Sequence, residues 1–241
     1  MVDFSIVMRL SLLKNIKRIY FHPKYVQWMI GILLSLTALA LAYYIIESVY
    51  LPVVILLLPV AKPVGHFLMV PLLRLVGLLK YYSPMLIGIN TNEKTLEIHN
   101  GSSFDYLINM RWRQRGLKAR KRMMIYYLKG FLKIIDDLEK KRLPEDVTLT
   151  GISYFFSNKS ARKIGFTEKS VGFFRKILFF VDYVNLFLMY SYSNGRLSFP
   201  DVSKLRKVEI SGKKLLQSKK NIIRLLTLIK KRNEYKTIPA V

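Results

Sequence analysis

The chain has 241 residues, with 40 Lys and Arg against 15 Asp and Glu, and a formal net charge of +25 at pH 7. Because 51% of its residues are hydrophobic, an intrinsically disordered chain is excluded. The chain has no cysteine, which excludes disulfides, thiolate zinc sites and cysteine nucleophiles, and its three histidines argue against a histidine-rich metal site. The basic excess predicts an anionic partner: anionic lipid, nucleic acid or a phosphate-bearing cofactor.

Residues 1–83 have the pattern of a membrane region. The first 25 residues mix apolar and basic side chains, which favours an amphipathic helix on a membrane surface. Residues 26–44 are apolar over nearly the ~20 residues that a transmembrane helix needs. Prolines interrupt a second apolar stretch, residues 51–79, which is therefore expected to be broken or re-entrant. Basic flanks predict an integral membrane protein whose N-terminus and main domain lie on the cytoplasmic side.

From residue 84 to residue 200 the pattern changes to that of a basic α/β domain. Two short apolar runs, residues 85–90 and 95–99, predict a β-hairpin, and residues 104–110 predict a third strand. A basic segment with one glycine leads into a long helix, whose apolar residues recur at helical spacing up to Leu138. Residues 147–156 then predict a strand, and residues 158–164 predict a short helix that ends at Gly165.

This order of elements, over about residues 85–166, resembles the central part of the GCN5-related N-acetyltransferase (GNAT) superfamily. In that superfamily the amides of a Q/R-x-x-G-x-G/A loop at a helix N-terminus bind the pyrophosphate of coenzyme A. The matching segment here is Arg113-Gln114-Arg115-Gly116-Leu117-Lys118, and Asn158 begins a later Asn-x-x-Ala segment. The resemblance implies acyl-CoA as the cofactor, no metal, and the following cofactor-binding residues: Arg113, Arg115, Gly116, Leu117, Lys118, Ala119 and Asn158.

Two features depart from the family pattern. Lys118 stands where the family has Gly or Ala, and the segment after Ala161 is short and lacks the tyrosine that often acts as general acid. The alternative for the loop is a solvated helix start beside an anionic surface. Family enzymes often use a strand carboxylate to deprotonate the amine. The candidate catalytic residues are Asp105, Glu97 and His99, and the alternative for each is an exposed strand residue.

Beyond Gly165 the resemblance ends. Residues 173–192 predict an apolar helix that Asn194-Gly195 terminates, where the family would have a β-hairpin. Residues 208–212 predict a short edge strand. Residues 201–241 form a basic C-terminal region, in which a helix over 213–232 presents a charged surface suited to anionic lipid or a partner.

The predicted fold class is therefore α/β: an N-terminal membrane helical hairpin, a small GNAT-like mixed α/β domain, and C-terminal helices. The favoured function is a membrane-anchored GNAT-like acyltransferase acting on an amine at the cytoplasmic membrane surface. The alternative is a non-catalytic accessory or assembly subunit of a membrane protein complex, with membrane, anionic lipid and protein as partners. Nucleic acid is disfavoured, because the aromatic residues lie chiefly in apolar runs. The acyl donor, the acceptor and catalysis itself stay open.

Overall fold

The computed structural model describes residues 29, 32–33, 36–37, 39–40, 43–44, 47, 73, 76–92, 94–101, 105–106, 109–110, 115–153, 158–172, 183–201 and 205–234. The helices and strands with assigned bounds follow one another in this order: β1 (Leu79–Ser83), β2 (Leu86–Asn92), β3 (Thr95–Asn100), α5 (Leu117–Glu139), β4 (Thr148–Ser153), α6 (Asn158–Ile164), β5 (Thr167–Ser170), α8 (Tyr183–Asn194), β6 (Arg206–Ser211), α9 (Gly212–Gln217) and α10 (Lys219–Glu234).

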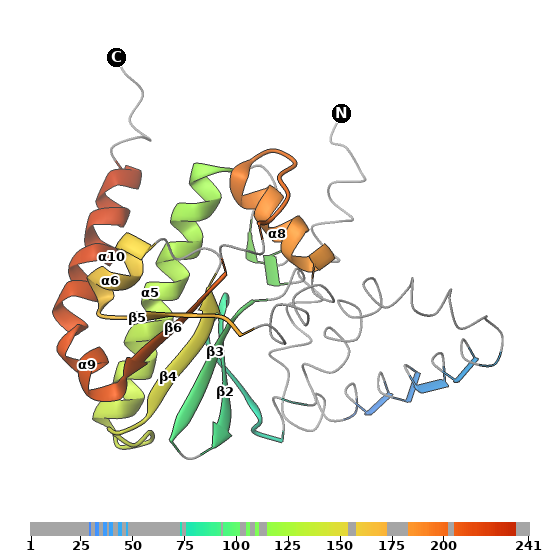
Figure 1. The fold of residues 1–241 in the computed structure, drawn as a ribbon, viewed down its shortest axis with the longest axis horizontal. Helices are drawn as coiled ribbons and strands as arrows, with labels where there is room; N and C mark the ends of the chain where they lie inside the picture. The colour runs from blue at the N-terminus through green and yellow to red at the C-terminus, as the bar shows by residue number, and fades with distance from the viewer. Residues whose placement is uncertain are drawn as a thin grey trace.

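A mixed sheet of six strands organises the described part of the chain, in the order β1-β2-β3-β4-β6-β5 (Figure 1). β3 and β4 are parallel, and the other neighbouring strands are antiparallel. A parallel pair needs a crossover connection, which contains α5. β6 lies between β4 and β5, so the prediction of an edge strand is wrong. The sheet also includes β1 and β6, which lie outside the expected domain boundaries at 84 and 200.

α5 covers one face of the sheet, and α6 and α10 lie on the same side (Figure 1). Its buried residues recur at helical spacing and form the apolar stripe that faces the strands. A Cβ at Gly130 would come within 2.6 Å of Leu86 Cδ2, so glycine lets the helix approach β2 closely. Because side chains alternate along a strand, Leu96 and Ile98 of β3 face α5, whereas Glu97 and His99 face away.

The β2–β3 hairpin, the long helix α5, the strand β4 and the short helix α6 confirm the corresponding predictions. The chain turns after α6 at Gly165, whose φ is +95°. The predicted strand over 104–110 is wrong, because the described residues Asp105, Tyr106 and Asn109 are helical. A short apolar run is compatible with a strand or with a helix. Here the Met110 amide donates a helical hydrogen bond of 2.9 Å to the Tyr106 carbonyl.

The C-terminal helix is divided, contrary to the prediction of one helix over 213–232. Ser218 separates α9 from α10, and its backbone amide donates to the carbonyls of Lys214 and Leu215 at 3.1 Å each. The Ser218 hydroxyl also donates to the Lys214 carbonyl at 2.9 Å. These bonds complete the last turn of α9 before the chain starts α10.

The expectation of an integral membrane protein is contradicted, because no helix among the described residues is both long and apolar enough to span a bilayer. α5 has 23 residues but is charged along its length, and the apolar α8 has only 12, against the ~20 apolar residues required. The predictions of a membrane hairpin anchor and of a cytoplasmic orientation are therefore wrong for the part of the chain that the structure describes. The segments 1–25, 26–44 and 51–79 lie largely outside the described residues.

Candidate functional site

The parallel pairing of β3 and β4 ends before the strands do. The ladder runs from Thr95–Thr148 to Ile98–Gly151, whereas β3 continues to Asn100 and β4 to Ser153. At the last pair, a Cβ on Gly151 would lie 2.7 Å from the Ile98 carbonyl oxygen. Glycine therefore permits the close backbone approach that precedes the end of the ladder.

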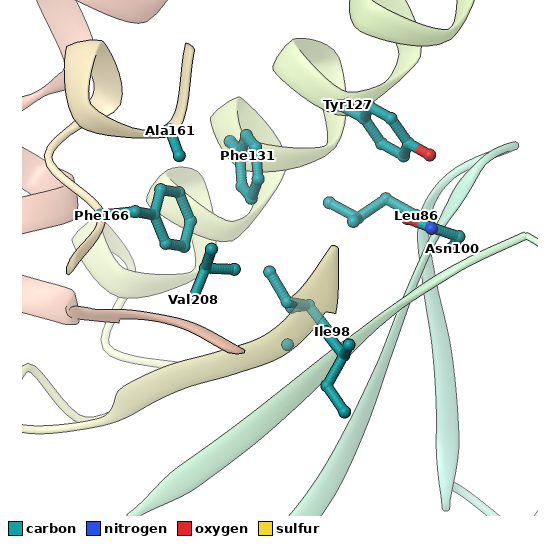
Figure 2. Close-up of a pocket in the computed structure, with 10 residues that line it drawn as sticks. Leu86, Ile98, Asn100, Tyr127, Phe131, Ala161, Phe166 and Val208 are labelled. Carbon is teal, nitrogen blue, oxygen red and sulfur yellow. The ribbon is translucent and has the colours of Figure 1, made fainter. Parts of the chain in front are cut away.

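An apolar pocket lies beneath α5 at the place where the β3–β4 ladder ends (Figure 2). The Phe131 and Phe166 rings stand at its side, with centroids 5.4 Å apart and planes at 52°. The cavity volume is about 20 Å³, which is room for one water molecule. An apolar ligand thus enters it only if neighbouring side chains or strands move apart. The lining residues are Leu86, Ile98, Asn100, Tyr127, Phe131, Gly151, Ile152, Ala161, Phe166 and Val208.

Two of the lining residues carry polar groups. Asn100 is the last residue of β3 and shares the α5-facing side of the strand with Ile98. Burial keeps the pKa of the Tyr127 phenol well above its usual value, although its hydrogen bond with Tyr106 opposes the shift. Tyr127 is thus an uncharged hydroxyl at neutral pH. Sequence reasoning missed Asn100; the available signal was a polar residue at the last inward position of a strand.

Most of the predicted cofactor-binding residues meet at the start of α5. Gly116 has φ +66° and ψ −134°, no side chain caps the helix start, and its first turn holds no acid. Within the described structure, the amides of Leu117, Lys118 and Ala119 have no hydrogen-bond acceptor. Leu117 and Lys118 are exposed, whereas Ala119 is fully buried, so the start of α5 has two amides available to an anion. Arg113 lies outside the described residues, as does the side chain of Asn158, which begins α6.

The start of α5 also contacts the end of α8, a relationship that the sequence did not predict. The Gly116 amide donates to the Tyr192 carbonyl at 3.1 Å. Arg120 donates through Nε to the Ser193 carbonyl at 3.0 Å, and through Nη2 to Asn194 Oδ1. Arg120 therefore satisfies carbonyl and amide oxygens at the C-terminal end of α8.

The candidate catalytic residues lie on the other side of β3 and just beyond it. His99 Nε2 and Glu97 Oε1 are 3.9 Å apart, and both side chains face away from α5 while their neighbours Ile98 and Asn100 line the pocket. Asp105 lies against Gly101, the residue that follows β3. The Tyr81 hydroxyl donates to Asp105 at 3.2 Å.

No family model, curated protein or solved structure matches the chain. Among the described residues, no three His, Asp or Glu side chains gather as a metal site, and the expectation of a metal-free protein stays a prediction. The site therefore consists of an apolar pocket at a parallel strand pair, a helix start with available amides, and a carboxylate and imidazole on the opposite face of β3.

Proposed function

We propose that the chain is a GNAT-like N-acyltransferase that transfers an acyl group from acyl-CoA to an amine. The observation that carries the proposal is the parallel β3–β4 pair, which ends at Ile98–Gly151 beside an apolar pocket beneath α5. The long helix between the two strands supports the resemblance. The antiparallel β5–β6 pair extends the sheet beyond β4, but its strands only flank residues 173–192, where the family would have a β-hairpin, so that departure stands.

The pocket is suited to the acyl end of a thioester. Its walls are apolar and Asn100 supplies a carboxamide at its edge, which can donate a hydrogen bond to the thioester carbonyl oxygen. In the reaction, the amine nitrogen attacks the carbonyl carbon, a C–N bond forms and the C–S bond breaks. The nitrogen loses one proton to a base, and the departing thiolate takes up one.

The start of α5 fits the phosphates of coenzyme A. Its two available amides, those of Leu117 and Lys118, and the positive end of the helix dipole favour an anion, and Arg115 and Lys118 add exposed positive charge. The helix runs from this point toward the pocket. From Leu117 to Tyr127 the path is about 15 Å at 1.5 Å per residue, a length that a pantetheine arm spans.

The base in this proposal is the Glu97–His99 pair. A carboxylate beside an imidazole can orient the ring and stabilise its protonated form. Both residues stand one position away from pocket-lining residues of β3, so an amine would approach from the sheet face that is remote from α5. Asp105 is the alternative base, and its hydrogen bond from Tyr81 places it near the end of β3.

A non-catalytic docking protein is the second candidate, and one observation favours it. The Gly116 amide and the Arg120 guanidinium are already bonded to α8, so part of the expected phosphate site is engaged within the chain. In that case the start of α5 serves only to hold α8.

Thioester turnover separates these two candidates. The full chain is mixed with acetyl-CoA and a panel of primary amines, and the released thiol is measured. Because the chain has no cysteine, every new thiol comes from the donor. Amine-dependent release that Asn100→Leu and His99→Gln reduce, without a change in thermal stability, supports the enzyme. Absence of both acetyl-CoA binding in calorimetry and thiol release would leave the docking protein.

A further inference from the structure

Large apolar side chains are exposed around the start of α5 and the end of α8. Leu117 is 73% exposed, Leu197 81% and Phe199 75%, and Leu188 of α8 is 51% exposed. Leu117 belongs to α5, and the others belong to α8 or to the loop that follows it. Isolated exposed apolar residues are ordinary on protein surfaces, but a group of them marks an interaction site.

Contacts within the chain bring these residues to one end of the molecule. A Cβ on Gly195 would lie 3.3 Å from the Gly116 Cα, so the backbone at Gly116, which precedes Leu117, lies beside the backbone at Gly195, which is two residues before Leu197. The Phe199 ring packs on Phe187 of α8 with centroids 5.0 Å apart. Figure 1 shows α8 beside the N-terminal end of α5.

The same end of the molecule is basic, and the nearest acidic residue in the following sequence is the exposed Asp201, two residues after Phe199. No Asp or Glu occurs within residues 106–135 or 183–200. Arg115, Lys118 and Arg196 are exposed here, and within the described structure no carboxylate forms an ion pair with any of the three. We define the α5/α8 surface as the four exposed apolar residues and these three basic ones: Leu117, Leu188, Leu197, Phe199, Arg115, Lys118 and Arg196.

We infer that the α5/α8 surface binds a small acidic protein that carries the acyl group as the thioester of a phosphopantetheine arm. This inference rests on the proposed acyl transfer and assigns its preferred donor, a protein-borne thioester that is used in addition to acyl-CoA. The reaction is unchanged: the amine takes the acyl group, and the carrier keeps its phosphopantetheine as the free thiol. The arm would enter along the start of α5 toward the pocket.

A protein carrier fits the α5/α8 surface better than a nucleotide does. The free amides of α5 suit the phosphate that coenzyme A and a carrier's arm have in common, but the nucleotide would need further donors, and the Gly116 amide and Arg120 are engaged by α8. The exposed leucines and the phenylalanine have no hydrogen-bonding groups for a nucleotide, whereas such apolar side chains are common anchors in protein–protein interfaces. The unopposed basic residues complement an acidic partner and accelerate its encounter.

The test compares two donors with the same full chain and the same amines. One donor is acetyl-CoA, and the other is a small acidic carrier protein bearing an acetylated phosphopantetheine group. We expect kcat/KM for the protein-borne donor to exceed that for acetyl-CoA by about tenfold or more at low salt, and the advantage to shrink as salt rises. Equal use of both donors would overturn the inference and leave the acyltransferase proposal standing. Use of neither donor would overturn both.

Variants of the α5/α8 surface provide a second test. Leu197→Ser and Arg196→Glu should each lower kcat/KM for the carrier-borne donor and leave that for acetyl-CoA unchanged. Leu228→Ser on α10 is the matched control, since Leu228 is also an exposed leucine but lies outside the α5/α8 surface. Equal losses with both donors would contradict a carrier site. If Leu197→Ser instead weakens binding to anionic vesicles or dissociates a dimer, and carrier turnover is unaffected, the surface has another occupant and the inference is overturned.

Discussion

The backbone amide of Gly116 donates a hydrogen bond of 3.1 Å to the carbonyl of Tyr192. Two helices that are distant in the sequence therefore meet end to end, with the negative end of the α8 dipole at the positive end of α5. An anion that binds the start of α5 must share this positive end with α8. Binding at this helix start and the position of α8 are thus expected to be coupled.

Gly116 should tolerate substitution poorly, even though a Cβ there would meet no atom closer than 3.7 Å. Its φ of +66° is unfavourable for residues with a side chain, so Gly116→Ala should lower the free energy of unfolding by about 1–3 kcal/mol. Urea unfolding measures this. The control is Gly172→Ala, where a Cβ would be in open space and the effect should stay within about 0.5 kcal/mol. Equal effects would contradict backbone strain at Gly116.

Arg120 should stabilise the end of α8 rather than α5 itself. Arg120→Met removes the donors to the Ser193 carbonyl and to Asn194 while keeping an unbranched side chain, and should cost about 1 kcal/mol. Hydrogen exchange should become faster in the last turn of α8 and stay unchanged in the middle of α5. Lys129→Met, an exposed change on the same helix, is the control. Unchanged protection of α8 would show that Arg120 is not its cap.

Sequence patterns predicted the elements whose signals are local. The β2–β3 hairpin, α5, β4 and α6 each have apolar periodicity or a terminating glycine within their own segment. β5 was missed because Thr167–Ser170 has no apolar alternation and is held by backbone pairing with β6. The single glycine in a basic loop predicted where α5 starts. The pocket and the α8 contact depend on where two strands part and where two distant helix ends meet, which no local pattern contains.

Asp137 should be the most important ionic group of the described structure. Its side chain is 1% exposed and pairs with Lys80 of β1 and, at 3.2 Å, with Arg142. Asp137→Ala removes the buried carboxylate that accepts from Lys80 and Arg142, whose side chains are 47% and 59% exposed, and should cost about 2–3 kcal/mol in thermal or urea unfolding. Glu139→Ala breaks an exposed pair with Lys219 and should cost at most about 1 kcal/mol. Similar losses for the two variants would refute the importance of burial.

Acid stability should depend on Glu209. Hydrogen bonds from Lys169 and Lys207, each 2.5 Å from a Glu209 oxygen, lower its pKa below the usual 4.5. Because the pKa is lowered in the folded state, the carboxylate contributes stability above pH 4.5, and this is lost as the pH falls through the lower folded-state value. Glu209→Gln should therefore reduce stability at pH 7 and flatten its decline below pH 4.5. Glu145→Gln, in an exposed turn, is the control for the substitution itself and should change stability at pH 7 by no more than about 0.5 kcal/mol.

Gly151 should control the separation of β3 and β4 at the pocket. In Gly151→Ala the new Cβ would lie 2.7 Å from both the Ile98 carbonyl oxygen and Ile98 Cγ1, so the strands must move apart. We expect a loss of about 1–3 kcal/mol in urea unfolding. The double variant Gly151→Ala/Ile98→Ala identifies the cause. The Ile98→Ala change removes the clash with the Ile98 side chain and keeps the clash with its carbonyl oxygen. Gly151→Ala should therefore cost as much stability in the Ile98→Ala background as it does in the wild-type chain. Full recovery would mean that the Ile98 side chain, rather than close approach of the two backbones, requires glycine at the end of the ladder.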